Sequence, residues 1–255
     1  MGEIIMNCEM TMNTEPNKLS IQPFTEVLLS NEIKDIGIDV SEIFLDSYLD
    51  DMAILQDLPA LKSFVAVGKT VKNIQAWFEW KNQLAFLSQL KKGRIDEEGL
   101  KKRNKAYRNK EKWVLREVEA LVVHMSKYTV VEKAKLQAEL YIDLINGVIT
   151  QNQFSECLDI LLHLFLSDIP HLLEIYQAEV DANLTEADWL NLNKKINTKF
   201  DATICRRLMA VGLLHQLHPM SFGFSMDNYF VTSDTGKYFC SIIQRCISVE
   251  SDEDF

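Results

Sequence analysis

Glycine and proline are both scarce in this chain, at 9 and 5 of its 255 residues. A fold rich in strands needs many tight turns, and turns draw on these two residues. The scarcity therefore favours long helices joined by few connections. With 47% hydrophobic and 25% charged residues, the chain has the usual globular composition and is long enough to bury a core. We expect a mostly α-helical protein.

Hydrophobic periodicity divides the chain into a multi-helix bundle and a smaller C-terminal module. We expect a flexible N-terminal tail at residues 1–22, the bundle at 23–182, the module at 183–247 and an acidic tail at 248–255. Within the bundle, residues 61–90 carry apolar side chains at steps of three and four, together with several aromatics. This pattern predicts a long core helix. The alternative is a helix that lies on a membrane surface or binds a partner protein.

Helix-start and helix-stop signals are clearest in the middle of the chain. Thr129 with Glu132, and Thr150 with Gln153, match the capping box that opens a helix. Gly147 lies between the two pairs and can take the left-handed conformation that ends a helix. The sequence therefore predicts a helix, a tight turn and a second helix in succession.

The C-terminal module shows a different pattern. Asp201 is placed to cap a helix that stops near Gly212, and residues 213–232 then alternate as strands do, with turn residues between them. Ser233 or Asp234 opens a last helix. The order of helix, hairpin and helix is similar to a winged helix, although the expected wing contains no lysine or arginine.

Positive charge is concentrated in residues 91–116. This basic segment holds eleven of the 27 basic residues and four acidic ones, a net charge of +7. Because the whole chain carries −10, the remaining residues carry −17. Such a segment suits the phosphates of a nucleic acid, anionic lipid or an acidic partner. The simplest interpretation is a solvated connection between helices that pairs with the chain's own acidic surface.

Candidate contact residues follow from these patterns. Basic side chains in the segment and in the 201–212 helix are candidates for an anion, nucleic acid or partner, and aromatic side chains are candidates for stacking. The basic candidates are Lys101, Lys102, Arg103, Lys105, Arg108, Lys110, Lys112, Arg206 and Arg207, and the aromatic candidates are Trp77, Trp80, Tyr107 and Trp113.

No pattern in the chain points to catalysis, a metal or a cofactor. The Gly68-Lys69-Thr70 triplet lacks the upstream glycine that a phosphate-binding loop requires. The five cysteines are an odd number with no CxxC pair, which favours a reducing compartment. The N-terminus has no basic region followed by an apolar run, so we expect no signal peptide and a cytoplasmic location.

Three stretches stand out as packing motifs: residues 44–90 (FLDSYLDDMAIL…), residues 133–161 (KAKLQAELYIDLINGVITQNQF…) and the ending RRLMAVGLL…YFVTSDTGKYF at residues 206–239. Together they resemble a family of uncharacterised bacterial helical proteins with a winged-helix-like C-terminal end. The resemblance implies that a closure motif of Tyr229, Thr232, Gly236 and Phe239 holds the hairpin on the final helix. It also implies a role in phage defence or stress, and it transfers no catalytic residue.

The sequence thus predicts a non-catalytic, cytoplasmic interaction or adaptor protein whose partner is a protein. The first alternative is a nucleic-acid-binding regulator that uses the basic segment or the 201–212 helix. The second is a peripheral membrane protein that uses the Trp77–Trp80 helix with the basic segment.

Overall fold

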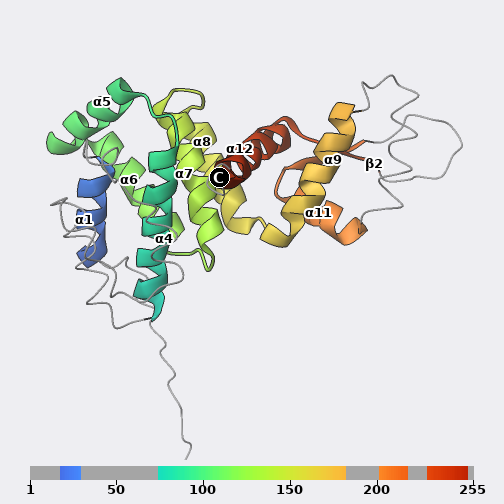
Figure 1. Cartoon of the computed structure of the whole chain (residues 1–255), viewed down its shortest axis with the longest axis horizontal. Helices are drawn as coiled ribbons and strands as arrows, with labels where there is room; N and C mark the ends of the chain where they lie inside the picture. Colours follow the sequence, from blue (N-terminus) through green and yellow to red (C-terminus); the bar gives the residue numbers. More distant parts are fainter. Residues whose placement is uncertain (1–17, 30–73, 182–200, 218–228, 252–255) are drawn as a thin grey trace, which may run out of the picture.

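The described part of the chain is helical apart from one two-stranded sheet (Figure 1). The computed structural model describes residues 18–29, 74–181, 201–217 and 229–251. This architecture confirms the predicted fold class. The elements in chain order are α1 (Lys18–Leu28), α4 (Ile74–Lys92), α5 (Glu97–Arg108), α6 (Lys112–Met125), α7 (Val131–Ile145), α8 (Gln151–His163), the 3-10 turn η3 (Leu166–Asp168), α9 (Ile169–Asp181), α11 (Ala202–Ala210), β1 (Leu214–Leu217), β2 (Tyr229–Thr232) and α12 (Asp234–Ser251).

Both predicted tails are shorter than expected. Helix α1 already begins at Lys18, although the tail was expected to reach residue 22, and Pro23 lies inside this helix. Helix α12 continues to Ser251, four residues into the expected acidic tail. The first part of the predicted 61–90 helix, up to residue 73, lies outside the described residues, as does the tip of the hairpin.

Helix α7 is the centre of the body, which comprises α1 and α4 to α8. Ten consecutive residues of α7, from Leu136 to Ile145, are buried. Helices α4, α6, α8 and α12 all pack against it. A helix that is buried on all sides has no single apolar stripe. The neighbouring helices must therefore supply hydrogen-bond partners for its polar side chains.

Aromatic side chains join the helices of the body in a chain of ring contacts. The ring of Phe86 on α4 lies 5.9 Å from that of Tyr141 on α7, and Tyr141 lies 6.0 Å from Phe154 on α8. Phe24 on α1 meets Phe86 edge-to-face at 5.9 Å. All four side chains are fully buried. Each such pair adds about 0.5–1.5 kcal/mol beyond its buried area.

The C-terminal module comprises α9, α11, α12 and the antiparallel pair β1–β2, in which Leu214 faces Thr232. Helix α9 packs on β2 and α12. The Glu179 carboxylate on α9 accepts from the backbone N–H of Thr232 at 2.6 Å and from its hydroxyl at 2.9 Å. The boundary at residue 182, which assigns α9 to the bundle, stays a prediction. Whether the module is a winged helix stays a prediction.

Two buried carboxylates on α7 attach α12 to the body. Asp143 accepts from the Tyr238 hydroxyl and from the Arg245 guanidinium, both at 2.7 Å. Glu139 lies 3.3 Å from Arg245 Nε and accepts from the Gln89 amide at 2.8 Å. Burial raises the pKa of Glu139, against the lowering effect of these two partners. The network joins α4, α7 and α12, which fixes how the module meets the body.

The two predicted capping boxes have different outcomes. Thr150 and Gln153 form the complete box at the start of α8, as predicted. The Thr129 box is wrong, because α7 begins at Val131 with Val130 as its N-cap and no side-chain cap. Thr129 lies one residue too early, and its side chain lines a pocket instead.

Among the helices that the structure describes, three end in the Schellman motif, in which the residue after the cap has a positive φ. Gly147 after α7 and Gly212 after α11 have φ of 72° and 80°, and both helices end where the sequence predicted. Lys110 after α5 has φ of 56°. Its N–H donates to the Tyr107 carbonyl oxygen at 2.9 Å, and that of Glu111 donates to Ala106 at 2.9 Å. At this left-handed φ the Cβ of a lysine lies too close to the neighbouring backbone. A glycine, which has no Cβ, adopts the same conformation without strain.

Lys110→Gly is therefore expected to raise the free energy of unfolding by about 1 kcal/mol, because it relieves the left-handed strain at the end of α5. Urea denaturation measures the change. The matched control is Lys101→Gly, which removes an exposed lysine from the interior of the same helix and should lower stability by about 1 kcal/mol. Equal losses for the two variants would contradict the strain argument.

Candidate functional site

The basic segment is not the plain connection that the sequence suggested, because most of it forms helix α5. Asp96 caps this helix by accepting from the backbone N–H of Gly99 at 2.9 Å and of Glu98 at 3.3 Å. Leu100, Arg103 and Ala106, spaced three apart, form its buried face. These signals, Asp96 followed by acids in the first turn and bases in the last, were present in the sequence and were missed.

Arg103 anchors α5 to the body. Its Nε donates to Glu117 Oε1 at 2.7 Å, and its Nη2 donates to the Leu144 carbonyl oxygen at 3.4 Å. The Tyr141 hydroxyl donates to the same Glu117 oxygen at 2.9 Å. The Arg103 and Glu117 side chains are 10% and 1% exposed. Arg103 is therefore a structural residue, and its prediction as a contact for a partner or nucleic acid is wrong.

The other predicted basic residues of the segment lie on the surface. Lys101, Lys102, Lys105 and Arg108 are exposed on the outer side of α5, and we call these four the α5 basic face. Lys101 lies 3.6 Å from Glu97 one turn away. For the other three, the described part of the chain offers no ion pair. Lys110 and Lys112 are exposed just beyond the helix and extend the same positive surface.

The predicted stacking residues are mostly unavailable to a ligand. Trp80 is fully buried in the core, so its prediction as a partner contact is wrong. Trp77 is half-buried and stacks on Trp80 with ring centroids 5.3 Å apart. Tyr107 is half-buried against the core. Trp113 is 40% exposed, and its indole N–H donates to Glu111 at 2.7 Å. The burial of Trp80 and Phe86 supports the core-helix interpretation for the later part of α4, whereas Phe78 near its start is 43% exposed.

Arg206 and Arg207 differ in their surroundings. Arg206 is exposed. Arg207 forms a two-pronged ion pair with Asp168, with Nε donating to Oδ2 at 2.8 Å. The Asp168 side chain is only 2% exposed. Because Arg207 neutralises this buried carboxylate, it is committed to holding α11 against η3 rather than to an external anion.

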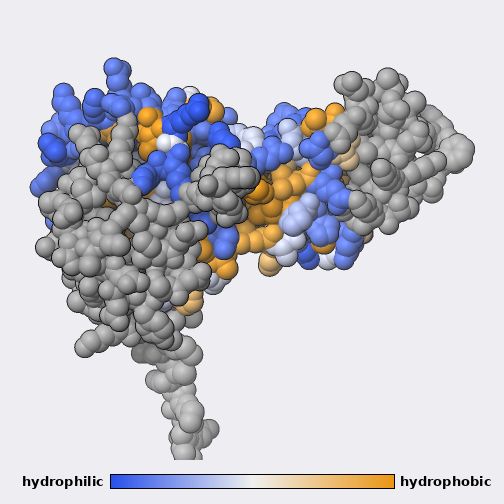
Figure 2. All heavy atoms as spheres, viewed as in Figure 1, coloured by the Kyte–Doolittle hydropathy of each residue, from blue (hydrophilic) through white to orange (hydrophobic). Residues whose placement is uncertain are grey.

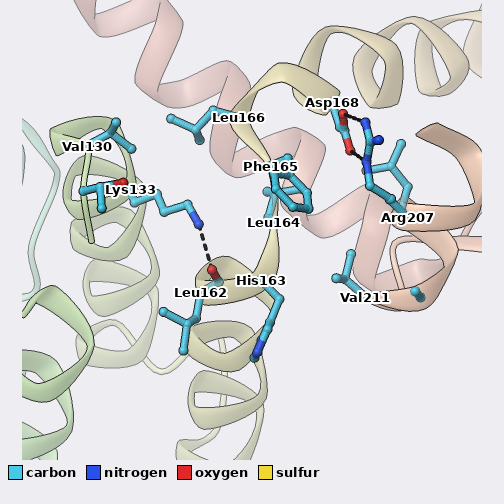
Figure 3. A pocket seen from close by; sticks show the side chains of 13 residues that line it. Val130, Lys133, Leu162, His163, Leu164, Phe165, Leu166, Asp168, Arg207 and Val211 are labelled. Atoms are coloured by element: carbon cyan, nitrogen blue, oxygen red, sulfur yellow. Dashed lines mark hydrogen bonds and ion pairs between the residues drawn. The ribbon is translucent and has the colours of Figure 1, made fainter. Parts of the chain in front are cut away.

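A pocket of about 630 Å³ lies where the body meets the module. It is formed by the start of α7, the connection from α8 into η3 and the helix α11. Figure 2 shows hydrophobic residues gathered along this junction, and Figure 3 shows the pocket side chains.

Two side chains of the pocket have notable surroundings. Phe165 is 59% exposed, with the Arg207 guanidinium 5.3 Å from its ring centre. Lys133 extends from α7 and donates to the Leu162 carbonyl oxygen at 2.8 Å (Figure 3). Burial lowers the pKa of Lys133.

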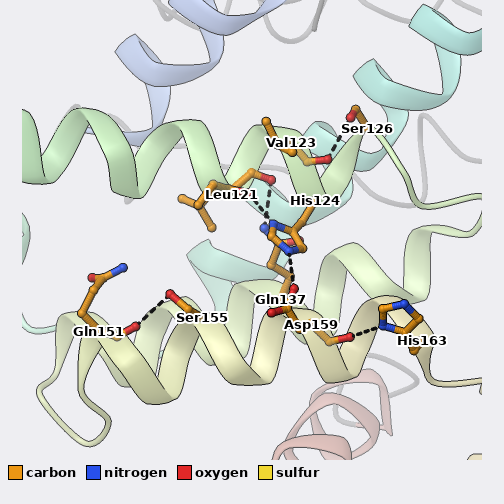
Figure 4. Close-up of polar contacts among 10 residues, drawn as sticks. Leu121, Val123, His124, Ser126, Gln137, Gln151, Ser155, Asp159 and His163 are labelled. Carbon is orange, nitrogen blue, oxygen red and sulfur yellow. Dashed lines mark hydrogen bonds and ion pairs between the residues drawn. The ribbon is translucent and has the colours of Figure 1, made fainter. Parts of the chain in front are cut away.

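His124 on α6 lies beside Asp159 on α8, and His163 lies one turn further along α8 (Figure 4). His124 Nε2 lies 3.5 Å from Asp159 Oδ1, while Nδ1 of His124 and of His163 each lie 2.8 Å from the carbonyl oxygen four residues earlier. Among the described residues, no group of three or more histidine, cysteine, aspartate or glutamate side chains is placed to hold a metal ion. The contact between His124 and Asp159 joins α6 to α8, whereas each of the other two lies within one helix.

Three of the four cysteines in the described regions, Cys157, Cys205 and Cys240, are buried and unsuited to attack as thiolates. Burial raises the pKa of Cys157 and of Cys240 to about 12 and also raises that of Cys205. All three thiols therefore stay protonated at neutral pH, and protonated thiols are poor nucleophiles.

Comparison with known proteins adds no further identification. No protein-family model, no curated protein and no solved structure matches this chain. The resemblance to a family of bacterial helical proteins, and the implied role in phage defence or stress, therefore stay predictions. Within the described residues, no helix is both long and apolar enough to cross a bilayer.

Proposed function

We propose that this chain is a non-catalytic interaction protein of the bacterial cytoplasm that binds an acidic protein surface through the α5 basic face. The observation that carries the proposal is the exposure of Lys102, Lys105 and Arg108 without an ion pair in the described part of the chain. Positive charge kept on the surface of a chain with net charge −10 attracts an acidic partner and orients it.

The face is also rigidly held, which lowers the entropy lost on binding. Lys101, Lys105 and Arg108 follow at intervals of four and three, so they form one stripe about 10 Å long on α5. The buried Arg103–Glu117 pair fixes the opposite side of the same helix. A partner that presents carboxylates along such a length would meet charges already in position.

The two alternatives receive less support. Stacking on nucleobases needs exposed aromatic faces, but Trp80 is buried and Trp113 is held by Glu111. A membrane-surface role for α4 would need an exposed apolar face, but Leu84, Phe86 and Leu90 lie in the core.

The test compares two double variants that each remove two exposed positive charges. Lys105→Gln with Arg108→Gln neutralises the α5 basic face, whereas Lys127→Gln with Arg206→Gln changes exposed residues elsewhere and is the control. Fluorescence anisotropy follows titration with labelled polyglutamate at low and moderate salt. We expect salt-sensitive binding by the unmodified chain and the control, and a loss of about fivefold in affinity for the α5 variant, because surface ion pairs contribute about 0.2–1 kcal/mol each.

A labelled mixed-sequence single-stranded oligonucleotide and liposomes with anionic lipid serve as competing ligands in the same assay. Tighter binding of the oligonucleotide or the liposomes than of polyglutamate, lost in the α5 variant, would replace the proposal by the matching alternative. Failure of all three ligands to bind would remove it. A pull-down from native cells with the same two variants then identifies the partner.

A further inference from the structure

The pocket between α7, α8–η3 and α11 has the size of a small-molecule site. Its volume of about 630 Å³ falls within the range of about 300–1,000 Å³ that is usual for ligand pockets. Its walls are largely apolar side chains, among them Leu162, Leu164, Leu166, Leu208 and Val211. It contains none of the residues of the α5 basic face, so an argument about its ligand does not depend on the proposed function.

The charges in the pocket leave one cation available. Arg207 and Asp168 neutralise each other through their two-pronged pair. The Lys133 ammonium has three N–H donors. One of them goes to the Leu162 carbonyl oxygen at 2.8 Å, and no described carboxylate pairs with Lys133. The fixed charges that line the pocket therefore sum to one positive charge beside apolar walls.

We infer that this pocket binds a small apolar acid, a molecule with a hydrocarbon body and a single carboxylate. The hydrocarbon body packs against Phe165 and Val211, and the carboxylate pairs with the Lys133 ammonium. Burial of the exposed Phe165 ring by the ligand supplies hydrophobic free energy. The carboxylate supplies the counter-charge that Lys133 lacks, in a half-buried setting where ion pairs are screened less than at the open surface. A cationic ligand would instead meet an uncompensated positive charge.

Three ten-carbon amphiphiles that differ in their head groups test this inference. Decanoate, decanol and decyltrimethylammonium are titrated into the full chain below their micelle concentrations, with isothermal titration calorimetry as the measurement. We expect decanoate to bind at least about tenfold more tightly than decanol, as a hydrogen bond to a charged group predicts, and the cation to bind weakest. Equal affinities for decanoate and decanol would overturn the inference.

Two variants locate the binding. Lys133→Met keeps the length of the aliphatic stem and should abolish the preference for decanoate over decanol, whereas the variant with Lys105→Gln and Arg108→Gln should keep it. Ala210→Trp places a large ring at the pocket from an exposed position, so it should block all three amphiphiles without disturbing the core. If Lys133→Met folds poorly, the Ala210→Trp variant still tests whether the amphiphiles bind in this pocket.

The outcomes that contradict the inference are distinct. Decanoate affinity unchanged by Ala210→Trp would show that the amphiphile binds elsewhere. Sedimentation that shows a dimer which Ala210→Trp dissociates would assign the pocket to a second copy of the chain. One further outcome separates the two proposals. If the unmodified chain binds decanoate but not polyglutamate, the proposed function is rejected and the inference about the pocket stands.

Discussion

Gly236→Ala is expected to destabilise the protein by about 3 kcal/mol or more, the upper end of the usual cost of overpacking. A Cβ at this position would lie 2.1 Å from the Leu213 carbonyl oxygen and 2.8 Å from Thr232 Cγ2. The backbone there has little freedom to move. Ser233 donates from its N–H to Leu213 at 3.0 Å and from its hydroxyl to Gly212 at 2.7 Å, and it accepts from the Gly236 N–H at 2.8 Å. The free energy of unfolding in urea measures the effect.

Gly147→Ala is the matched control. Gly147 has a positive φ, but a Cβ there would meet nothing within 4 Å. The control should therefore lose only about 1 kcal/mol, the cost of a left-handed alanine. A similar loss for both glycines would show that close approach at Gly236 is not the dominant effect. Because the resemblance names Gly236 in the closure of the hairpin, the result also tests how the module is built.

Glu117→Leu is expected to cost about 3–5 kcal/mol, because it leaves the buried Arg103 guanidinium without its carboxylate. The Tyr141 hydroxyl loses its acceptor at the same time. Arg103→Met alone should also destabilise the chain, because it leaves the Glu117 carboxylate buried without its cation. In the double variant neither charge is left buried, so it should be more stable than Glu117→Leu alone.

Thermal and urea unfolding of the four proteins give the coupling energy of the pair. Tyr141→Phe, which removes only the hydroxyl, is the control and should cost about 1 kcal/mol. Additive losses for Glu117→Leu and Arg103→Met would contradict the coupling. Strong coupling would confirm that Arg103 holds α5 in place, and thereby the surface that carries Lys105 and Arg108.

The sequence predicted features that depend on a few neighbouring residues. The Thr150 box at the start of α8, the Asp201 cap of α11 and the glycine ends at Gly147 and Gly212 all lie where expected. The prediction failed at Thr129, because a cap depends on the residue at which the helix begins, and α7 begins one residue later than the box requires.

Helix α5 was missed for a different reason. Its charged residues suggested a solvated connection, and its buried face is only Leu100, Arg103 and Ala106. An arginine at the centre of a buried face breaks the apolar periodicity from which helices are predicted. Only the presence of Glu117 on the next helix makes that arginine a core residue.

The sequence by itself determined the helical class, several helix ends and the concentration of positive charge in residues 91–116, because these depend on composition and on local backbone chemistry. Only the tertiary structure decided which charges remain available to a partner. Arg103 and Glu117 are 14 residues apart, and Arg207 and Asp168 are 39 apart. A buried charge needs a partner close in space, and for these two arginines the fold supplies it. Lys105 and Arg108 stay on the surface because α5 turns its other face inward.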